Sequence, residues 1–225
     1  MTIGLLASAC FEDPAVIAGE LSGTNKFRYL CDDSAAVKSC SGTAATFPSA
    51  VAKSALFRLS IDPTSARDVN ELRPISDEVV GTHAGGAWFC GTEGLAGFVA
   101  FDRGGSVVDY VHVKVETPIR LVLEGYKASG SGFDRASGTP VTTSSVRVGE
   151  KVYLSVSPIG RSGTALAGAL VYSWTPAADG IVRVTDLGTP SNPSAFVMLT
   201  GVKSGTTRLR IDGAGLSTEF EVSVQ

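Results

Sequence analysis

Apolar and polar positions alternate along the chain, most clearly over residues 146–156, VRVGEKVYLSV. Within this stretch Val152, Leu154 and Val156 lie on one side, and Lys151, Tyr153 and Ser155 lie on the other. Side chains of a strand point alternately to its two faces, so this period of two predicts a β-strand with one buried face.

The same alternation returns twice in the second half. Leu170, Tyr172 and Trp174 repeat it, and Phe220, Val222 and Val224 close the chain with it. A strand, a strand bearing Trp, a hairpin marked by Gly and a terminal strand form the outline of an immunoglobulin-like sandwich. The pattern predicts an all-β fold.

Two motifs recur in the same order, which indicates an internal repeat of domain size. Residues 51–61 (VAKSALFRLSI) match 146–156 at a shift of 95, and residues 94–115 match 201–224. We therefore expect two tandem immunoglobulin-like β-sandwich domains, at 26–116 and 118–225. Pro118 favours an extended residue before it, so the linker at 116–118 should be short, with limited hinge motion.

Composition restricts the possible partners. Of the 225 residues, 44% are hydrophobic and 18% charged, which suits a packed core rather than disorder. The net charge is −3 and the basic residues are scattered singly, which argues against a nucleic-acid surface. No apolar run approaches the roughly 20 residues of a spanning helix.

The second half resembles the group 2 bacterial immunoglobulin-like domain. The residues that carry the resemblance are Val148-Gly149-Glu150, Trp174, Ile181–Val184, the Gly201–Gly205 turn, and the closing Phe220, Val222 and Val224. The first half matches in its late strands and lacks a counterpart of Trp174, since Trp88 lies too near the Gly94–Gly97 turn. The resemblance implies an extracytoplasmic module of bacterial surface and periplasmic proteins, used for spacing, adhesion or carbohydrate and protein contact, without enzymatic activity.

Residues 1–25 are expected to be a signal remnant, a lipid anchor and a tether. In MTIGLLASAC, short apolar and small residues precede Cys10, which resembles a bacterial lipoprotein signal whose Cys becomes the lipidated mature N-terminus. Phe11 in place of Asp suits an outer-membrane lipoprotein. Two alternatives stay open: cleavage after Ala7-Ser8-Ala9, which leaves Cys10 free to pair, and an ordinary frayed N-terminus.

The other cysteines are interpreted in the light of export. Cys31 and Cys40 lie nine residues apart, a spacing that predicts a local disulfide in an exported protein. A metal site there would need CxxC spacing or a nearby His. Cys90 is then left as a small buried hydrophobe, or as a partner for Cys10 if Cys10 is not lipidated.

Chemistry of a site is sparse in this sequence. The polar loop 126–144 contains a possible binding loop at Phe133, Asp134 and Arg135, with a solvated connector as the alternative. A hydrolase would need His83 or His112 to meet a Ser and a carboxylate, yet no G-x-S-x-G or H-E-x-x-H motif occurs. No motif indicates a cofactor or a metal site.

These observations predict a non-catalytic cell-envelope lipoprotein. It would act as a surface or periplasmic spacer and protein-interaction module, with the membrane as a partner through Cys10. Envelope proteins or carbohydrate are the other possible partners, contacted by loop tips or by an exposed sheet edge. The alternative is a carbohydrate-binding or adhesion protein, which predicts exposed aromatics in the 126–144 or 186–195 loops. A hydrolase is a third class.

Overall fold

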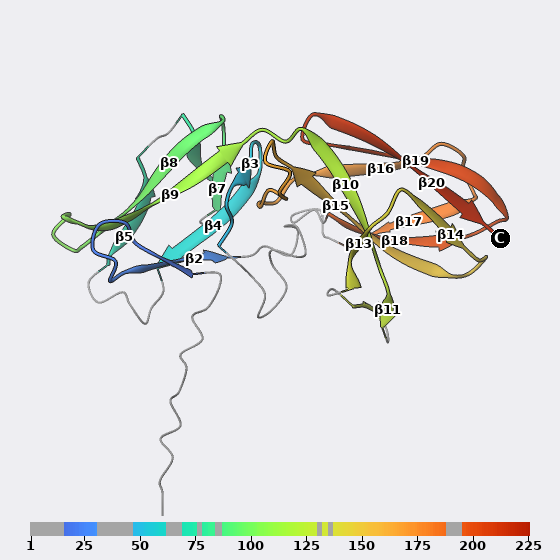
Figure 1. Ribbon diagram of the computed structural model, residues 1–225, viewed down its shortest axis with the longest axis horizontal. Helices are drawn as coiled ribbons and strands as arrows, with labels where there is room; N and C mark the ends of the chain where they lie inside the picture. Colours follow the sequence, from blue (N-terminus) through green and yellow to red (C-terminus); the bar gives the residue numbers. More distant parts are fainter. Residues whose placement is uncertain are drawn as a thin grey trace, which may run out of the picture.

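The structure is a computed structural model. It describes residues 16–30, 47–61, 69–75, 78–83, 87–129, 132–134, 137–187 and 195–225, with the side chains of Val16, Thr82 and His83 left out. All the regular elements in these ranges are β-strands. Figure 1 shows two bodies of strands placed end to end along the long axis of the molecule.

The first body consists of two sheets, with strand orders β1-β2-β4-β7-β6 and β3-β9-β8-β5. Its strands are β1 (Val16–Ala18), β2 (Lys26–Leu30), β3 (Val51–Ala52), β4 (Leu56–Ile61), β5 (Glu71–Pro74), β6 (Val80–His83), β7 (Ala87–Cys90), β8 (Gly94–Phe101) and β9 (Val107–Glu116).

The second body repeats this arrangement, with orders β13-β10-β15-β18-β17 and β14-β20-β19-β16. A two-stranded hairpin, β11-β12, is added to it. The strands are β10 (Arg120–Tyr126), β11 (Ala128–Ser129), β12 (Gly132–Phe133), β13 (Thr139–Pro140), β14 (Thr143–Val146), β15 (Lys151–Ile159), β16 (Tyr172–Pro176), β17 (Val182–Asp186), β18 (Phe196–Gly201), β19 (Gly205–Gly213) and β20 (Leu216–Val224).

Each body has the strand order of an immunoglobulin sandwich. One sheet follows the order A-B-E-D and the other G-F-C, with a short strand parallel to the last strand of the body. That short strand is β3 beside β9 in the first body and β14 beside β20 in the second. The all-β, tandem immunoglobulin-like fold predicted from the sequence is confirmed.

One turn shows the repeat at the level of single hydrogen bonds. Ser54 N–H donates to Cys90 O at 2.8 Å, and Gly149 N–H donates to Gly201 O at 2.8 Å. Ser54 and Gly149 differ by 95 positions, the shift found in the sequence, and both have positive φ, +67° and +82°. Since L-residues rarely adopt this conformation, its recurrence shows that the two turns are equivalent.

Two details differ from the sequence expectation for the strands. In the first body the strand that corresponds to β16 is β5. It carries Leu72 packed against the core, so Trp174 has no aromatic counterpart there. β15 was expected to bury one face, but Tyr153 and Ser155 on its other face are buried as well. Both faces are covered because the β11-β12 hairpin brings Phe133 onto Tyr153.

Part of the expected tether belongs to the first sandwich, which corrects the 1–25 boundary. β1 pairs with β2, and the turn after it reaches the opposite sheet at Asp109. The buried Asp109 carboxylate accepts hydrogen bonds from Leu21 N–H at 3.0 Å and from the Ser22 hydroxyl at 2.5 Å. A buried carboxylate needs such donors, so residues 16–25 fold onto the body instead of leading away from it.

The two bodies are joined by backbone hydrogen bonds. The segment that follows β15 lies against β3 and the start of β4 in the other body. Ala52 N–H donates to Ala167 O at 2.8 Å, and Leu56 and Ala169 exchange bonds of 2.9 and 2.6 Å. We call this contact, between residues 50–56 and 160–170, the joint. It gives the end of the first body the partners that its own sheets do not supply.

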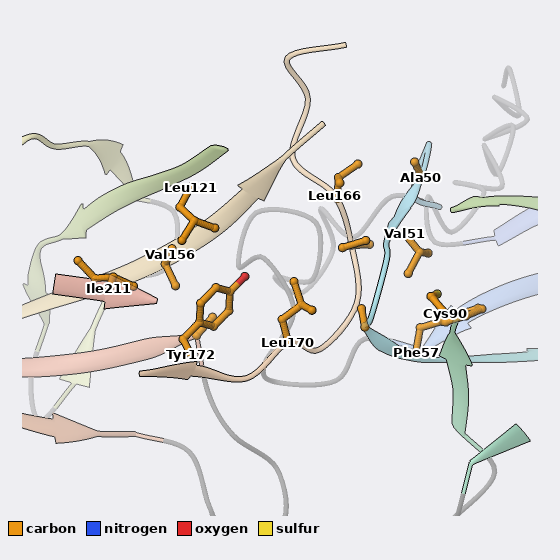
Figure 2. Close-up of a cluster of buried hydrophobic side chains, with 14 of the residues drawn as sticks. Ala50, Val51, Phe57, Cys90, Leu121, Val156, Leu166, Leu170, Tyr172 and Ile211 are labelled. Atoms are coloured by element: carbon orange, nitrogen blue, oxygen red, sulfur yellow. The ribbon is translucent and has the colours of Figure 1, made fainter. Parts of the chain in front are cut away.

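The hydrophobic core runs through the joint without interruption. Figure 2 shows Leu121, Val156, Tyr172 and Ile211 of the second body at one side, and Ala50, Val51, Phe57 and Cys90 of the first at the other. Leu166 and Leu170 lie between them and are buried. Small residues on the first body allow the close approach, since Ala52 and Ala55 are fully buried.

A buried carboxylate forms a hydrogen bond between the two bodies at the edge of the joint. Glu116, at the end of β9, has 3% of its side chain exposed. It accepts a hydrogen bond from the backbone N–H of Arg161 across the joint, and another from Lys114 Nζ at 2.9 Å. The Lys114 hydrogen bond, followed by the Arg161 N–H, lowers the pKa of Glu116 below its usual value.

Replacement of Gly168 by Ala should open the joint. Gly168 has φ +99°, and an added Cβ would lie 2.6 Å from Ala55 Cβ and 2.9 Å from Val51 Cγ1. Such overpacking costs about 1–3 kcal/mol on top of the backbone strain. Gly163 is the matched control, because it lies in the same segment at φ +81° with open space around it. Urea unfolding should show a larger loss of unfolding free energy for G168A than for G163A. Equal losses would contradict the tight packing of Gly168 in the joint.

Acid should weaken the joint through Glu116. Its folded-state pKa lies below the unfolded value near 4.5, so the unfolded chain binds the proton more readily. The stabilisation is therefore present above that value and is lost as pH falls through the folded pKa. In urea titrations at a series of pH values, E116Q should show a shallower fall of unfolding free energy over this window than the wild type. Parallel curves would exclude the role of Glu116.

Candidate interaction surfaces

The site residues expected from the sequence fall partly outside the described residues. Cys10, Cys31, Cys40 and Arg135 lie outside, so the anchor and the disulfide remain predictions. Phe133 and Asp134 are described, in and just after β12.

Phe133 packs onto the second body. Its ring centroid lies 5.4 Å from that of Tyr126, 5.1 Å from Tyr153 and 5.2 Å from Phe196. The ring is half-buried and covers the outer side of β10, β15 and β18. The aromatic residue expected at a binding-loop tip therefore serves mainly to cover other aromatic rings.

A polar network lies beneath this aromatic cluster. The Tyr126 hydroxyl donates to Glu124 Oε2 at 2.9 Å and contacts Ser155 Oγ at 2.9 Å. All three residues are buried. The hairpin is closed by the backbone, since Asp134 N–H donates to Lys127 O at 2.9 Å. The described residues of this loop, 126–129, 132–134 and 137–144, thus include short strands and cover part of the outer face of the second body.

The clearest difference between the two bodies is the outer face of their G-F-C sheets. In the second body this face is charged: Arg210 and Asp212 approach to 2.9 Å, and Arg208 and Glu219 to 3.7 Å. In the first body the corresponding face, formed by β5, β8 and β9, carries exposed apolar side chains. These include Ile75 (69% exposed) and Leu95 (58% exposed). We call it the β5-β8-β9 face.

His112 lies on the β5-β8-β9 face and is paired with a carboxylate. Glu20 accepts from the His112 backbone N–H at 2.7 Å, and its other oxygen lies 2.7 Å from Nδ1. Burial acts to raise the pKa of Glu20, but the hydrogen bonds and charge of His112 outweigh it and lower the pKa. The Tyr110 ring packs edge-to-face against His112, with centroids 5.5 Å apart.

The pairing of His112 does not extend to a nucleophile in the described residues. Ser22, near Glu20 in the sequence, directs its hydroxyl to Asp109 and Thr24. His83 lies on β6, in the opposite sheet from His112. The described ranges also contain no cluster of three or more His, Cys, Asp or Glu side chains placed to hold a metal ion.

Cys90 is a free, fully buried thiol next to the joint. Burial raises its pKa to about 12, so the thiolate is strongly disfavoured at neutral pH. The side chain packs as a small hydrophobe, which is one of the two alternatives predicted from the sequence. Among the described residues, no helix has the length and apolar character needed to cross a bilayer.

Sequence reasoning missed the buried acids Asp109 and Glu116. A signal for Asp109 exists in the strand VVDYVHVKVE, because Asp109 occupies the same phase as the buried Val111, Val113 and Val115. A carboxylate in a core-facing position must receive hydrogen bonds from elsewhere in the chain. The segment that supplies them cannot be read from the strand.

No family model and no curated protein matches the chain. Among solved structures, domains 4 and 5 of the S-layer protein SbsC show 18% identity and a TM-score of 0.33, covering 75% of this chain and 82% of that one. The Yersinia pseudotuberculosis adhesin InvE shows 14% and 0.34, covering 79% and 57%. Invasin, a bacterial integrin-binding protein, shows 14% and 0.32, covering 76% and 36%. At these TM-scores the likenesses carry no weight, and the fold assignment rests on the strand order.

Truncation of Phe133 should destabilise the second body. Loss of a half-buried ring with three aromatic neighbours should cost about 2 kcal/mol. F133L keeps an apolar cover and should lose less. Urea unfolding followed by aromatic fluorescence measures both. An unfolding free energy that is unchanged in F133A would show that the ring does not stabilise the second body.

Proposed function

We propose that this chain is a non-catalytic protein of the bacterial cell envelope, which acts as a spacer and protein-interaction module outside the cytoplasm. The observation that supports the spacer role is the joint. Its backbone hydrogen bonds, continuous core and Glu116 hydrogen bond hold two sandwiches in one orientation. A flexible tether would need none of these contacts, whereas a rigid spacer depends on them.

The proposed domains are 26–116 and 118–225, with residues 16–25 folded onto the first. The proposed anchor is a lipid on Cys10, which would place the chain on the outer membrane, since Phe11 rather than Asp follows the Cys. Residues 11–15 then remain as the link between the anchor and the first strand, Val16–Ala18. A disulfide between Cys31 and Cys40 completes the proposal for an exported protein.

Intact mass of the protein isolated from its native membrane tests the anchor. We expect a mass gain matching acyl chains on the peptide that begins at Cys10, and recovery in the membrane fraction. Reduction should add two hydrogens on the peptides containing Cys31 and Cys40. Cys90 should react with an alkylating reagent only after denaturation, because it is buried.

The control is C10S, which should lack the mass gain and leave the membrane fraction while keeping the same unfolding curve. An unmodified Cys10 in soluble wild-type protein would remove the lipoprotein part of the proposal. The spacer part would then be tested separately by G168A and G163A: a larger stability loss in G168A supports it, and equal losses contradict it.

A further inference from the structure

The outer face of the second body carries positive charges on neighbouring strands. Lys151 on β15 and Arg183 on β17 both pair with Thr200 of β18, which lies between them. Lys151 and Arg183 are exposed, whereas Val152 and Val182 beside them face the core. Lys151, Thr200 and Arg183 therefore form one row across three strands, with the two charged residues about 10 Å apart. We call these three residues the cationic row.

The charges of the cationic row are not neutralised by the part of the chain that the structure describes. The ion pairs found there involve other side chains. On the other sheet of the same body, Arg210 makes three hydrogen bonds to Asp212 at 2.9–3.0 Å. Glu150, next to the row in sequence, instead accepts the backbone N–H of Arg147 at 2.9 Å. The row thus leaves two positive charges for a partner.

A third cation lies at the end of the row, and the first body does not cover this region. Lys203 is exposed in the turn after β18, and its N–H donates to Ile181 O at 3.3 Å, just before β17. Lys151 begins β15, whereas Ile159 ends it beside the joint, so about 27 Å of strand separates the row from the joint. The row is therefore open to a large ligand.

An aromatic side chain adjoins the cationic row. Two residues further along the strands Tyr153 pairs with Met198, and the Phe133 ring packs onto Tyr153 with centroids 5.1 Å apart. Phe133 remains partly exposed. The face of an aromatic ring carries partial negative charge, which favours contact with C–H groups such as those on the apolar side of a sugar ring. This surface therefore offers cations and a ring side by side.

The combination fits an acidic polysaccharide better than a membrane or an acidic peptide. Carboxylates along a sugar chain can meet a row of cations while the apolar side of a sugar contacts Phe133. A bilayer would need apolar side chains that protrude, but Phe133 is held against Tyr126, Tyr153 and Phe196. A peptide that adds to a sheet uses backbone groups at an edge, whereas the side chains of the row point away from a face.

We propose that the outer face of the second body binds an acidic polysaccharide, with Lys151, Arg183 and Lys203 contacting its carboxylates and Phe133 contacting a sugar ring. The ion pairs are exposed to solvent, so the affinity is modest and falls as salt is added. This inference goes beyond the envelope role and is independent of the lipid anchor, because it concerns a surface that the isolated chain presents.

Titration calorimetry of the full chain with polygalacturonate at low salt tests the proposal. Wild-type protein should bind polygalacturonate, release it as salt is raised, and leave dextran, a neutral polysaccharide, unbound. K151Q/R183Q should bind about tenfold more weakly, since each cation near an anionic surface strengthens binding a few-fold.

R208Q/R210Q is the matched control, because it removes two exposed positive charges from the other sheet of the same body and changes the net charge equally. It should bind like the wild type, and thermal unfolding should confirm that both double variants fold. Wild-type protein that does not bind polygalacturonate would overturn the proposal, as would equal losses in the two double variants. Equally tight binding of polyglutamate or of phosphatidylglycerol vesicles would also overturn it, because the surface would then respond to charge alone.

Discussion

Burial of the Glu116 carboxylate at the joint is the constraint on which the arrangement of this molecule depends. A carboxylate with almost no contact with water must receive hydrogen bonds, and one of them comes from the Arg161 N–H of the other body. The backbone groups of Ala52 and Leu56 impose the same requirement, because they also find their partners across the joint. Since these are directional contacts inside a continuous core, the two sandwiches are fixed in angle as well as in distance.

β9 connects this constraint to the other end of the first sandwich. Asp109, early on the strand, points inward, while Glu116, at its end, points outward. Burial acts to raise the pKa of Asp109, but the hydrogen bonds from Ser22, Leu21 and Tyr110 outweigh it and lower the pKa. One strand therefore holds the N-terminal segment through one acid and the second body through the other. Both attachments rely on ionised carboxylates, so both are retained at neutral pH.

The strands were predictable because their evidence is local. Alternation over 146–156 and over the final strand identified buried faces, and the shift of 95 predicted the repeat that Ser54 and Gly149 show in hydrogen bonds. The joint was not predictable, since the segment 160–170 is rich in small residues and its apolar positions follow no strand or helix period. Its partner, residues 50–56, lies more than a hundred positions away.

The packing role of Phe133 was not predictable for a related reason. The stretch 126–144 is polar and rich in Gly and Ser, which is typical of a solvated loop. The sequence does not show that Tyr126, Tyr153 and Phe196 gather on one outer face and need a cover. Residues 16–25 were interpreted as a tether in the same way, because Asp109, which holds them, is far along the chain. In each case a distant side chain decided whether a polar segment is ordered.

The shared turn has a consequence for how such a pair can diverge. Around Ser54 the turn carries Ala52, Ala55 and Leu56, whereas around Gly149 it carries Arg147, Glu150 and Lys151 at the same places. The backbone hydrogen bonds are alike, but one surface is apolar and buried and the other is charged and exposed. The two repeats are therefore specific to their positions: the apolar turn of the first can receive a neighbouring sandwich, whereas the charged turn of the second cannot, so the two units are not interchangeable along the chain.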